Sequence, residues 1–338
     1  MAISSSDPVA GTDKLFLGID VGGTNVKVGL VDRDGRLHAK ESAATPELRT
    51  PQRVIDFAVD FGRRGARSIG RCESDLAAVG LAVPGVLDTA AYELREVVNL
   101  PGWVNKPLLE ILSQSSSLPS AVVNDANSAA FAEHALRGLK SQSLALVTLG
   151  TGIGCGLVVD GAPFSGDHGC AGELGHIPVR FGPDAVPCTC GSRGHLESYA
   201  GAAGVINRLE SLLKEVDQGT IPATLCSDTV SPKEIAEAAA KGFPPAIAVL
   251  EETGQLVGQA IGMLGQVFDP AVVLLGGAMT FGGKGTTTGD LFRQNVRDAV
   301  KETTLVQVGG NMVIDFATLG NDAGVLGAAM VSVQMSET

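Results

Sequence analysis

Residues 15–32 read LFLGIDVGGTNVKVGLVD, and this stretch decides the fold class. An apolar run, a glycine-rich turn and a second apolar run that ends in Asp32 are typical of two strands joined by a turn. A similar phrase, LALVTLGTGIGCGLVVD, occupies 144–160. Two phrases of the same kind predict a chain with two related halves.

Length and composition predict a globular chain of about two domains. The 338 residues suggest about two domains, and 44% hydrophobic against 18% charged residues leaves ample material for two cores. Glycine accounts for 44 residues without a collagen period, so many glycines are expected at turns or where the backbone approaches a ligand. The net charge of −12 and the absence of a basic stripe predict no nucleic-acid partner.

The sequence predicts a cytoplasmic protein with no membrane partner. The segment MAISSSDPVAGTDK has no apolar core of signal-peptide length, and the uncharged span 141–159 is interrupted by four glycines. In that compartment the six cysteines are expected to be reduced rather than paired.

The remaining pattern alternates helices and strands, which predicts an α/β fold. Strands are expected over 76–85, 121–125 and 271–279. Helices are expected over 51–69, 106–116, 128–138, 196–215, 231–241, 245–268 and 322–334. A glycine-, proline- and cysteine-rich stretch covers 161–195.

The first glycine-rich turn has the composition of a phosphate site. Glycines at a strand end allow backbone N–H groups to approach phosphate oxygens, and Thr24 adds a hydroxyl donor. Asp20 is a candidate ligand for Mg²⁺, directly or through water. An ordinary hairpin turn that is rich in glycine explains the same residues, so both interpretations stay open.

The second turn does not match either common nucleotide motif. The spacing over 150–154 is not G-x-G-x-x-G, a strand rather than a helix follows, and GxxxxGK[ST] is absent. Two hairpin turns could instead hold one nucleotide from opposite sides of a cleft. Coincidence between two glycine-rich hairpins is the alternative.

Asn124 and Asp125 follow a short apolar strand and precede an alanine-rich helix. In isolation, Asp125 is best explained as the N-cap of that helix. It is also placed to accept a proton from an attacking hydroxyl, as an aspartate does in kinase-type phosphoryl transfer, and much of its contribution is then orientation of that hydroxyl.

The densest polar group of the chain lies in 173–197. Two imidazoles and two thiolates, from His176, Cys188, Cys190 and His195, are the ligand set of a structural tetrahedral Zn²⁺ site. Reduced cysteines in a loop are the alternative, because the Cys-x-Cys gap is shorter than usual. The other cysteines, Cys72, Cys155, Cys170 and Cys226, are expected to be small core residues.

Five segments in order, DVGGTNVK, VNDANSAA, LGTGIGCG, GELGH and CTCGSRGHLE, resemble the family of repressors, open-reading-frame proteins and sugar kinases called ROK, and within it the bacterial ATP-dependent glucokinases. The resemblance runs from residue 15 to about residue 331. It implies an actin-like fold of two ribonuclease-H-like lobes with a cleft between them. The small lobe is expected at 1–123 plus 322–338, and the large lobe at 124–321 with a zinc-binding loop at about 173–197.

The resemblance also implies site residues. For ATP it implies Asp20, Gly22, Gly23, Thr24, Asn25, Lys27, Gly150, Thr151, Gly152, Gly276 and Gly277, of which Asp20 would hold Mg²⁺. For the sugar it implies Gly85, Asn124, Asp125, Glu173, His176 and Glu197, with Asp125 as the catalytic base. The family binds its zinc with one His and three Cys, so His195 departs from the pattern and changes the charge and reach of the fourth ligand.

The implied function is ATP-dependent phosphorylation of glucose at its 6-hydroxyl by a homodimer that uses ATP, Mg²⁺ and a structural Zn²⁺. A kinase for another hexose, such as N-acetylglucosamine, N-acetylmannosamine, fructose or allose, is the nearest alternative. A sugar-responsive repressor is disfavoured, because about 14 residues before the first strand are too few for a helix-turn-helix domain and the net charge opposes DNA binding. A non-catalytic sugar-binding protein is disfavoured by Asp20, the two turns and Asp125.

Overall fold

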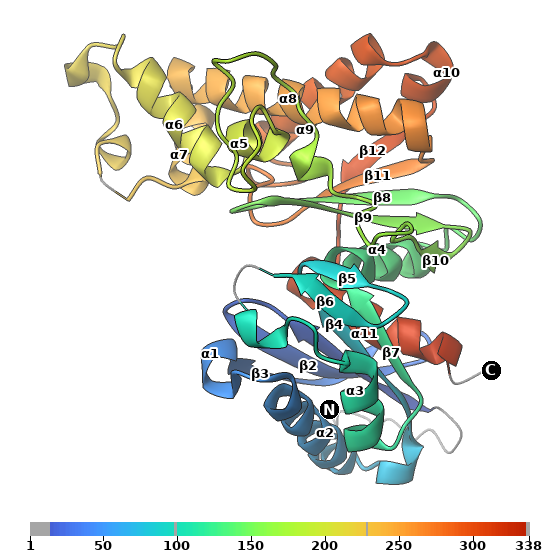
Figure 1. Cartoon of the computed structure of the whole chain (residues 1–338). Helices are drawn as coiled ribbons and strands as arrows, with labels where there is room; N and C mark the ends of the chain where they lie inside the picture. The colour runs from blue at the N-terminus through green and yellow to red at the C-terminus, as the bar shows by residue number, and fades with distance from the viewer. Residues whose placement is uncertain (1–13, 98–99, 228, 336–338) are drawn as a thin grey trace, which may run out of the picture. The chain divides into compact units, whose positions relative to one another are not determined.

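The structure is a computed structural model that describes residues 14–97, 100–227 and 229–335. The chain forms two compact units, each of which is described by itself (Figure 1). The first unit contains the described parts of Met1–Val123 and Gly324–Thr338, and the second contains those of Asn124–Ala323. The chain therefore passes from one unit to the other twice.

The first unit is built on a five-stranded sheet. Its strand order is β3 (Leu37–Ala44), β2 (Asn25–Asp32), β1 (Leu15–Val21), β4 (Leu76–Val83) and β7 (Ser120–Asn124). A separate two-stranded sheet consists of β5 (Val86–Asp88) and β6 (Glu93–Glu96). The helices of this unit are α1 (Thr45–Leu48), α2 (Pro51–Ser68), α3 (Leu108–Ser116) and α11 (Ala323–Met335), with single 3₁₀ turns at Glu73–Asp75 and Pro101–Trp103.

The second unit has a five-stranded sheet of its own. Its strand order is β10 (Ala162–Pro163), β9 (Ile153–Val159), β8 (Leu144–Leu149), β11 (Val272–Gly276) and β12 (Val313–Phe316). Its helices are α4 (Asp125–Leu136), α5 (Leu196–Ala200), α6 (Ala202–Leu213), α7 (Pro232–Ala240), α8 (Pro244–Phe268), α9 (Thr287–Thr303) and α10 (Val306–Gly309). Single 3₁₀ turns lie at Leu174–His176, Gln218–Thr220, Ala223–Leu225 and Gly320–Asp322.

The two sheets share one plan. In each sheet the first two strands form an antiparallel hairpin, the third pairs antiparallel with the second, and the fourth pairs in parallel with the first. The fifth strand lies beside the fourth. These two mixed sheets confirm the two related halves that the repeated glycine phrases predict.

In each half, the helix that follows the last strand of the sheet packs on the sheet of the other half. Helix α4 follows β7 of the first unit but packs on β8 and β9 of the second, whereas α11 follows β12 of the second unit and packs on the sheet of the first. The opposite faces of the sheets carry the main hydrophobic cores, with α2 and α3 in the first unit and α5 to α9 in the second. This exchange explains why the chain crosses between the units immediately before each of these helices.

Three glycines in neighbouring strands allow α11 to approach the first sheet. Gly18 pairs in register with Gly29 on one side and Gly80 on the other, so the three form a row across β2, β1 and β4. A Cβ at Gly18 would lie 2.1 Å from the Val325 carbonyl oxygen, and one at Gly80 would lie 1.8 Å from the carbonyl oxygen of α11 residue 328. Glycine is required here because the backbone of α11 occupies the space of a side chain.

We therefore expect Gly80→Ala to lower the free energy of unfolding by about 3 kcal/mol, because the methyl group displaces α11. Urea denaturation measures this difference. Gly219→Ala is the matched control, since its Cβ would meet only the Asp217 carboxylate, at 3.6 Å. Equal stability of the two variants would contradict the close packing of α11.

Most predicted elements are present, with boundary shifts of a few residues. The structure adds β3, β5, β6, β10, β12, α1, α9 and α10, none of which was predicted. Among the described residues, no helix combines the length and the apolar character that a membrane span requires.

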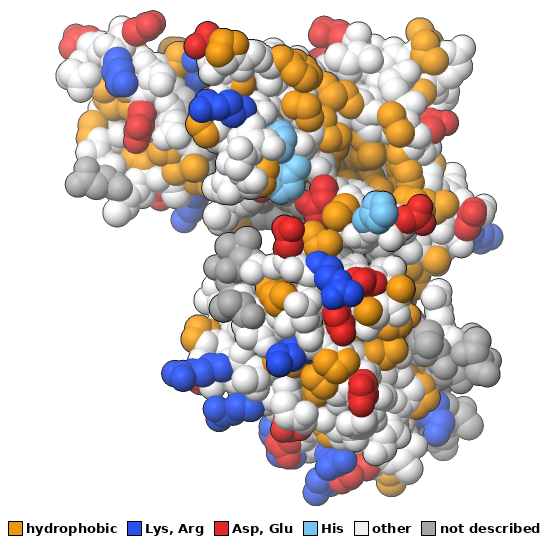
Figure 2. Space-filling model, viewed as in Figure 1, with side chains coloured by type: hydrophobic (Ala, Val, Ile, Leu, Met, Phe, Trp, Pro, Cys, Tyr) orange, Lys and Arg blue, Asp and Glu red, His pale blue; other side chains and the backbone are white. Residues whose placement is uncertain are grey.

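The surface of the first unit mixes charges of both signs. On the face seen in Figure 2, Lys and Arg side chains stand among Asp and Glu side chains. Arg64, for example, pairs with Glu41 at 3.3 Å, and Arg67 pairs with Glu73 at 3.0 Å. Interspersed charges of this kind are typical of a solvated surface rather than of a phosphate-binding stripe.

Candidate active site

The second glycine turn, Gly150–Gly154, joins β8 to β9. It is closed by a hydrogen bond of 3.0 Å from the Gly150 N–H to the Gly152 carbonyl oxygen. Strand β11 runs parallel to β8, so its own terminal glycine turn reaches the same edge of the sheet. At Gly277, where φ is +87°, a Cβ would lie 2.2 Å from the Leu149 carbonyl oxygen. The two turns of this unit that were expected to bind the nucleotide are therefore in contact.

A cavity of about 430 Å³ lies next to Gly277 and belongs entirely to the second unit. Its lining combines apolar side chains with hydroxyl groups, which suits a flat aromatic ring that carries polar edges. The lining residues are Pro232, Lys233, Ala236, Glu237, Ala240, Ala278, Met279, Phe281, Gly282, Thr286 and Thr288. The sequence analysis predicted only the neighbouring glycines, because the residues on α7 join the cavity through tertiary packing alone.

The single helix predicted over 196–215 is wrong, because the chain breaks at Gly201 to contact the second glycine turn. A Cβ at Gly201 would lie 2.6 Å from the Glu197 carbonyl oxygen and 3.1 Å from that of Thr151. The N–H of Ala202 donates a hydrogen bond of 3.0 Å to the Gly150 carbonyl oxygen. The bend at Gly201 therefore separates α5 from α6.

Glu197 supports the same turn with its side chain. Its Oε2 accepts a hydrogen bond of 2.9 Å from the Ile153 N–H. A Cβ at Gly152 would lie 2.5 Å from this oxygen, so the turn and the carboxylate are in direct contact. The resemblance implies a sugar contact for Glu197, and the structure adds a second task, which is to fix the turn on α5.

The GELGH segment runs along β9. A Cβ at Gly172 would lie 2.3 Å from the Cys155 carbonyl oxygen, and one at Gly175 would lie 2.3 Å from the carbonyl oxygen of residue 153. This close packing places Glu173 and His176 beside β9, with 3.9 Å between Glu173 Oε2 and His176 Nε2. Burial, with a smaller contribution from the Glu173 charge, raises the pKa of the Cys155 thiol to about 12. Cys155 therefore stays protonated.

The four predicted zinc ligands converge. The Nδ1 atoms of His176 and His195 are 3.4 Å apart, Cys188 Sγ is 3.8 Å from His176 Nδ1, and Cys190 Sγ is 3.3 Å from His195 Nδ1. All four ligand atoms lie within 4.8 Å of one another. A tetrahedral Zn²⁺ with ordinary bond lengths places its ligand atoms about 3.4–3.8 Å apart, so this cluster fits a structural zinc site.

The geometry also accounts for histidine at position 195. His195 faces the cluster with Nδ1, the ring nitrogen nearer the backbone, so its reach is close to that of a cysteine sulfur. A hydrogen bond from the Ser192 backbone lowers the pKa of the Cys190 thiol and favours the thiolate that a metal requires. Because His195 directly precedes α5, the cluster fixes the start of the helix that carries Glu197.

The prediction that the other four cysteines are core residues is wrong for three of them. Cys155 is buried, but Cys72, Cys170 and Cys226 are exposed. A cysteine is small enough to be tolerated on a loop surface, so residue type alone did not decide burial.

Asn124, not Asp125, is the N-cap of α4. Its Oδ1 accepts hydrogen bonds from the N–H groups of Ala126 and Asn127, at 2.9 and 3.1 Å. Asp125 is then the first residue of the helix, and its Oδ1 accepts a bond of 2.8 Å from the Ala126 N–H. The simpler explanation of Asp125 as a helix cap is therefore wrong.

Helix α4 starts beside the second glycine turn. A Cβ at Gly154 would lie 3.9 Å from the Ala126 side chain, and one at Gly156 would lie 2.0 Å from the Ala126 carbonyl oxygen. Asn127 fixes this end of the helix on β9 by accepting a hydrogen bond of 2.8 Å from the Leu157 N–H. Four of the five motifs quoted from the sequence thus gather in the second unit.

The fifth motif forms the first glycine turn, in the first unit. The N–H of Gly22 donates a hydrogen bond of 2.9 Å to the Asn25 carbonyl oxygen. Thr45, the first residue of α1, donates from its hydroxyl to the Gly22 carbonyl oxygen at 2.7 Å and from its N–H to the Thr24 carbonyl oxygen at 2.9 Å. Hydrogen bonds within the first unit therefore hold the turn at Gly22 and at Thr24.

Asp20 precedes this turn and is largely enclosed. Its Oδ2 lies 3.7 Å from Lys27 Nζ on the neighbouring strand. At Gly324, in the first turn of α11, a Cβ would lie 2.6 Å from Asp20 Cγ and Oδ2. Burial raises the pKa of the Asp20 carboxyl, and the Lys27 ammonium offsets part of that rise. A charged carboxylate held in this way is a suitable partner for a divalent cation.

We expect Asp20→Asn to raise the melting temperature by about 2–4 °C at neutral pH without Mg²⁺. Because the pKa of Asp20 is higher in the folded state than its ordinary value of 3.8, ionisation of Asp20 destabilises the fold. The free energy of unfolding therefore falls as the pH rises from 3.8 through the raised pKa. Thermal unfolding measures the change.

Asp32→Asn is the matched control and should change stability in the opposite direction. Although burial raises the pKa of Asp32, hydrogen bonds from the Arg36 N–H and from His38 outweigh it and lower the pKa overall. Ionised Asp32 therefore stabilises the fold above its ordinary pKa. A lower melting temperature for Asp20→Asn than for the unmodified protein would show that ionised Asp20 does not destabilise the fold.

Gly85 has a structural reason to be glycine. Its φ is +87°, and a Cβ would lie 2.2 Å from the Glu96 carbonyl oxygen. This contact joins the turn after β4 to β6 within the first unit. A sugar contact at Gly85 remains a prediction.

Comparison with known proteins gives the family. Residues 16–334 match the model described as the ROK family. A glucokinase of Streptomyces coelicolor is 33% identical over 331 residues, which cover 93% of this chain and 96% of that protein. The chain therefore belongs to the ROK family, as one of its sugar kinases.

Relatives at lower identity include an N-acetylmannosamine kinase of Citrobacter koseri, which is 28% identical over 94% of this chain and 98% of that protein. A xylose repressor of Caldicellulosiruptor bescii is 26% identical over 95% of this chain and 78% of that protein.

Solved structures give the same fold. The ROK hexokinase of Thermus thermophilus has a TM-score of 0.77 and 29% identity, over 96% of this chain and 99% of that one. A ROK family glucokinase of Streptomyces griseus in complex with glucose and AMPPNP has a TM-score of 0.74 and 30% identity, over 95% and 99% of the two chains. The actin-like fold that the resemblance implies is confirmed.

Proposed function

We propose that this protein transfers the γ-phosphoryl group of ATP to the 6-hydroxyl of glucose, with Asp125 as general base. The observation that carries the proposal is that Asn124 caps α4, which leaves Asp125 at the start of the helix beside the second glycine turn. Glucose is favoured as the acceptor by the full-length similarity to glucokinases.

The reaction needs positioning and charge neutralisation more than covalent chemistry. In the proposed reaction, the Asp125 carboxylate orients the sugar hydroxyl and accepts its proton. The hydroxyl oxygen forms a bond to the γ-phosphorus while the bond from that phosphorus to the β,γ-bridging oxygen breaks, which gives ADP and the sugar phosphate. Backbone N–H groups of the glycine turns would bind the phosphates, and Asp20 would hold Mg²⁺, which would offset phosphate charge.

The cavity beside Gly277 supports ATP as the phosphoryl donor. Met279 and Phe281 contribute apolar atoms to the lining for a purine ring, and Lys233 and Glu237 on α7 contribute charged groups. Gly276 and Gly277 bring this cavity to the turn at Gly150. A nucleotide with its base in the cavity would have its phosphates directed along the second glycine turn.

Zinc has a structural part in this proposal. His176, Cys188, Cys190 and His195 would hold it, and the ion would stabilise the loop rather than take part in the transfer. The loop carries Glu173 beside His176 and leads into α5, where the Glu197 carboxylate accepts from the Ile153 N–H. These carboxylates are the proposed contacts for sugar hydroxyls.

A coupled assay with ATP and Mg²⁺ against glucose, fructose, allose, N-acetylglucosamine and N-acetylmannosamine tests the proposal. We expect the highest kcat/KM with glucose. A 28% identical relative from Citrobacter koseri is named an N-acetylmannosamine kinase. A higher kcat/KM with N-acetylmannosamine than with glucose would make that sugar the proposed substrate and leave the kinase assignment intact. Turnover of none of these sugars would overturn the kinase assignment.

The homodimer and the cytoplasmic location also stay proposals. Exposed large apolar side chains of the second unit, Phe181, Met263, Val267, Leu305 and Val306, are compatible with a protein partner. Figure 2 shows hydrophobic side chains on the visible face of this unit. Sedimentation of the purified protein measures the number of chains.

A further inference from the structure

A buried carboxylate on α4 holds the chain segment that precedes the second crossing. Glu133 is 1% exposed. Its Oε1 accepts hydrogen bonds from the backbone N–H groups of Thr318 and Leu319, the latter at 2.8 Å. Its Oε2 accepts from Arg137 Nε at 2.8 Å and from the Thr318 hydroxyl at 3.1 Å. Both carboxylate oxygens are thus fully used, and the charge is compensated.

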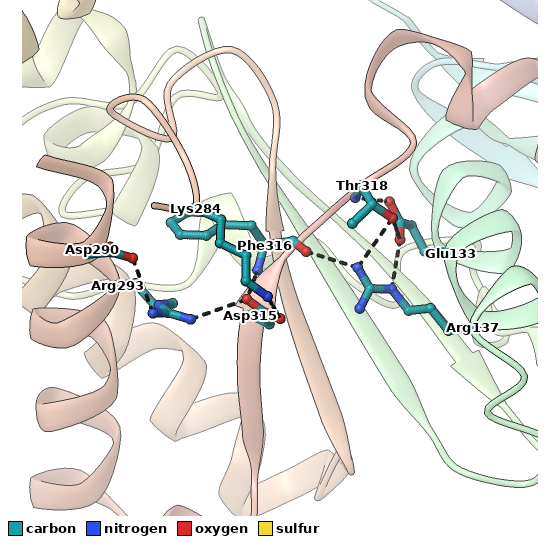
Figure 3. A network of polar contacts seen from close by, with 8 residues as sticks. All are labelled: Glu133, Arg137, Lys284, Asp290, Arg293, Asp315, Phe316 and Thr318. Atoms are coloured by element: carbon teal, nitrogen blue, oxygen red, sulfur yellow. Dashed lines mark hydrogen bonds and ion pairs between the residues drawn. The ribbon is translucent and has the colours of Figure 1, made fainter. Parts of the chain in front are cut away.

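Arg137 extends this contact by one helical turn. Its Nη2 donates a hydrogen bond of 2.9 Å to the Phe316 carbonyl oxygen. Figure 3 shows that Glu133 and Arg137 reach from α4 to the chain just beyond β12. We call Glu133, Arg137, Thr318 and Leu319 the Glu133 cluster.

The other side of β12 is held independently. Asp315 Oδ1 accepts from Arg293 at 3.2 Å, and Asp315 Oδ2 pairs with Lys284 at 2.9 Å (Figure 3). These groups belong to α9 and to the loop before it, not to α4. The strand therefore has its own supports, and the Glu133 cluster is an additional connection to α4.

The place of the cluster in the chain gives this connection a consequence. Helix α4 begins with Asp125, immediately after the first crossing, and the held segment ends at Leu319. Residues 320–323 then lead across the second crossing to Gly324, which packs against Asp20. Helix α4 thus links Asp125 to Glu133, Glu133 holds Thr318 and Leu319, and residues 320–323 lead covalently from there to Gly324.

We propose that Glu133 is a positioning residue that fixes the second crossing on the helix that carries Asp125. The proposal rests on the proposed function, because it concerns the residues that the phosphoryl transfer uses. Without the carboxylate, two backbone N–H groups and one guanidinium lose their acceptor. Residues 318–319 then lose their attachment to α4, while Phe316 and Ala317 stay paired with β11. The chain at 318–323, which leads into the second crossing, is then no longer fixed on the helix that carries Asp125.

The central test compares Glu133→Ala with Glu133→Gln by kinetics and amide hydrogen exchange. In Glu133→Ala, we expect the exchange protection of the Thr318 and Leu319 amides to fall about tenfold or more, and kcat to fall about tenfold. The KM for ATP should stay within about twofold, because the nucleotide cavity is untouched. In Glu133→Gln, the amide oxygen still accepts from both N–H groups, so most of the protection and of kcat should return.

Two further variants separate positioning from general stability. Arg137→Leu removes the bond to the Phe316 carbonyl but leaves Glu133 in place, so we expect a smaller fall in kcat, about threefold. This variant provides the test if Glu133→Ala does not fold. Val300→Ala removes buried volume from α9 and lowers stability without touching the cluster. It should leave both kcat and exchange at 318–319 unchanged.

A Glu133→Ala protein that loses stability or amide protection but keeps kcat within twofold of the unmodified protein would overturn the positioning role. So would a Glu133→Gln protein as slow as Glu133→Ala. Failure of the proposed function is recognised differently, since the unmodified protein would then phosphorylate no hexose before any substitution is made.

Discussion

Asp125→Asn is expected to lower kcat by about 10³-fold while the sugar still binds. Asparagine keeps the size of the side chain and an oxygen that accepts the Ala126 N–H, so α4 retains its first turn. It cannot accept a proton from the sugar hydroxyl. The loss should therefore appear in kcat, measured by the coupled assay, with a sugar Kd from calorimetry within about threefold of the unmodified protein.

Asp290→Asn provides the matched control for this substitution. Asp290 also lies in the first turn of a helix, α9, where it pairs with Arg293 at 3.2 Å. The change of charge at a helix N-terminus is the same, but no proposed substrate contact is involved. We expect kcat to change less than twofold. Turnover retained in Asp125→Asn would remove Asp125 from the mechanism.

The strands and turns of the site could be predicted from the sequence because their signals are local. Apolar runs beside glycine-rich turns indicate strands whatever surrounds them. Strands β1, β8 and β11 precede such turns, and β2 and β9 follow them. The four residues of the His/Cys cluster could be named as candidate zinc ligands from their residue types. Their short Cys-x-Cys spacing left reduced cysteines as an alternative, and the family resemblance favoured zinc.

Other features depend on contacts that no local pattern contains. The break at Gly201 accompanies a hydrogen bond from the Ala202 N–H to the Gly150 carbonyl oxygen. The nearby Thr151 and Glu197 carbonyl oxygens require glycine at 201. The row of Gly18, Gly29 and Gly80 requires the register of three strands, which the sequence does not state. Glu133 looks like an ordinary helical residue until its partner segment, 185 residues further on, is known.

Helix α9 was missed although its signal is present. Phe292, Val296 and Val300 recur every four residues and are buried, and Thr286 caps the helix by accepting a hydrogen bond from the Gly289 N–H. Its threonine-rich start and charged face resemble a loop when they are taken separately. The periodic pattern would have identified this helix, whereas no pattern would have identified the break at Gly201.

Loss of the metal is the second large effect that we expect. The purified protein should contain about one Zn²⁺ per chain, and Cys188→Ala should lose it. Without the metal, His176 and His195 no longer hold the loop, and α5 is free to shift with Glu197, whose carboxylate supports the second glycine turn. We therefore expect kcat/KM to fall by about 10–100-fold, together with a lower melting temperature.

His195 gives the sharpest form of this test. Because its Nδ1 faces the cluster, His195→Cys should keep zinc, whereas His195→Ala should lose most of it. Cys226→Ala, at an exposed cysteine far from the cluster in sequence, should keep both zinc and activity. Zinc content by elemental analysis, thermal unfolding and the coupled assay provide three separate readouts. A metal-free protein with full activity would refute the zinc assignment, and His195→Ala with unchanged zinc content would show that His195 is not a ligand.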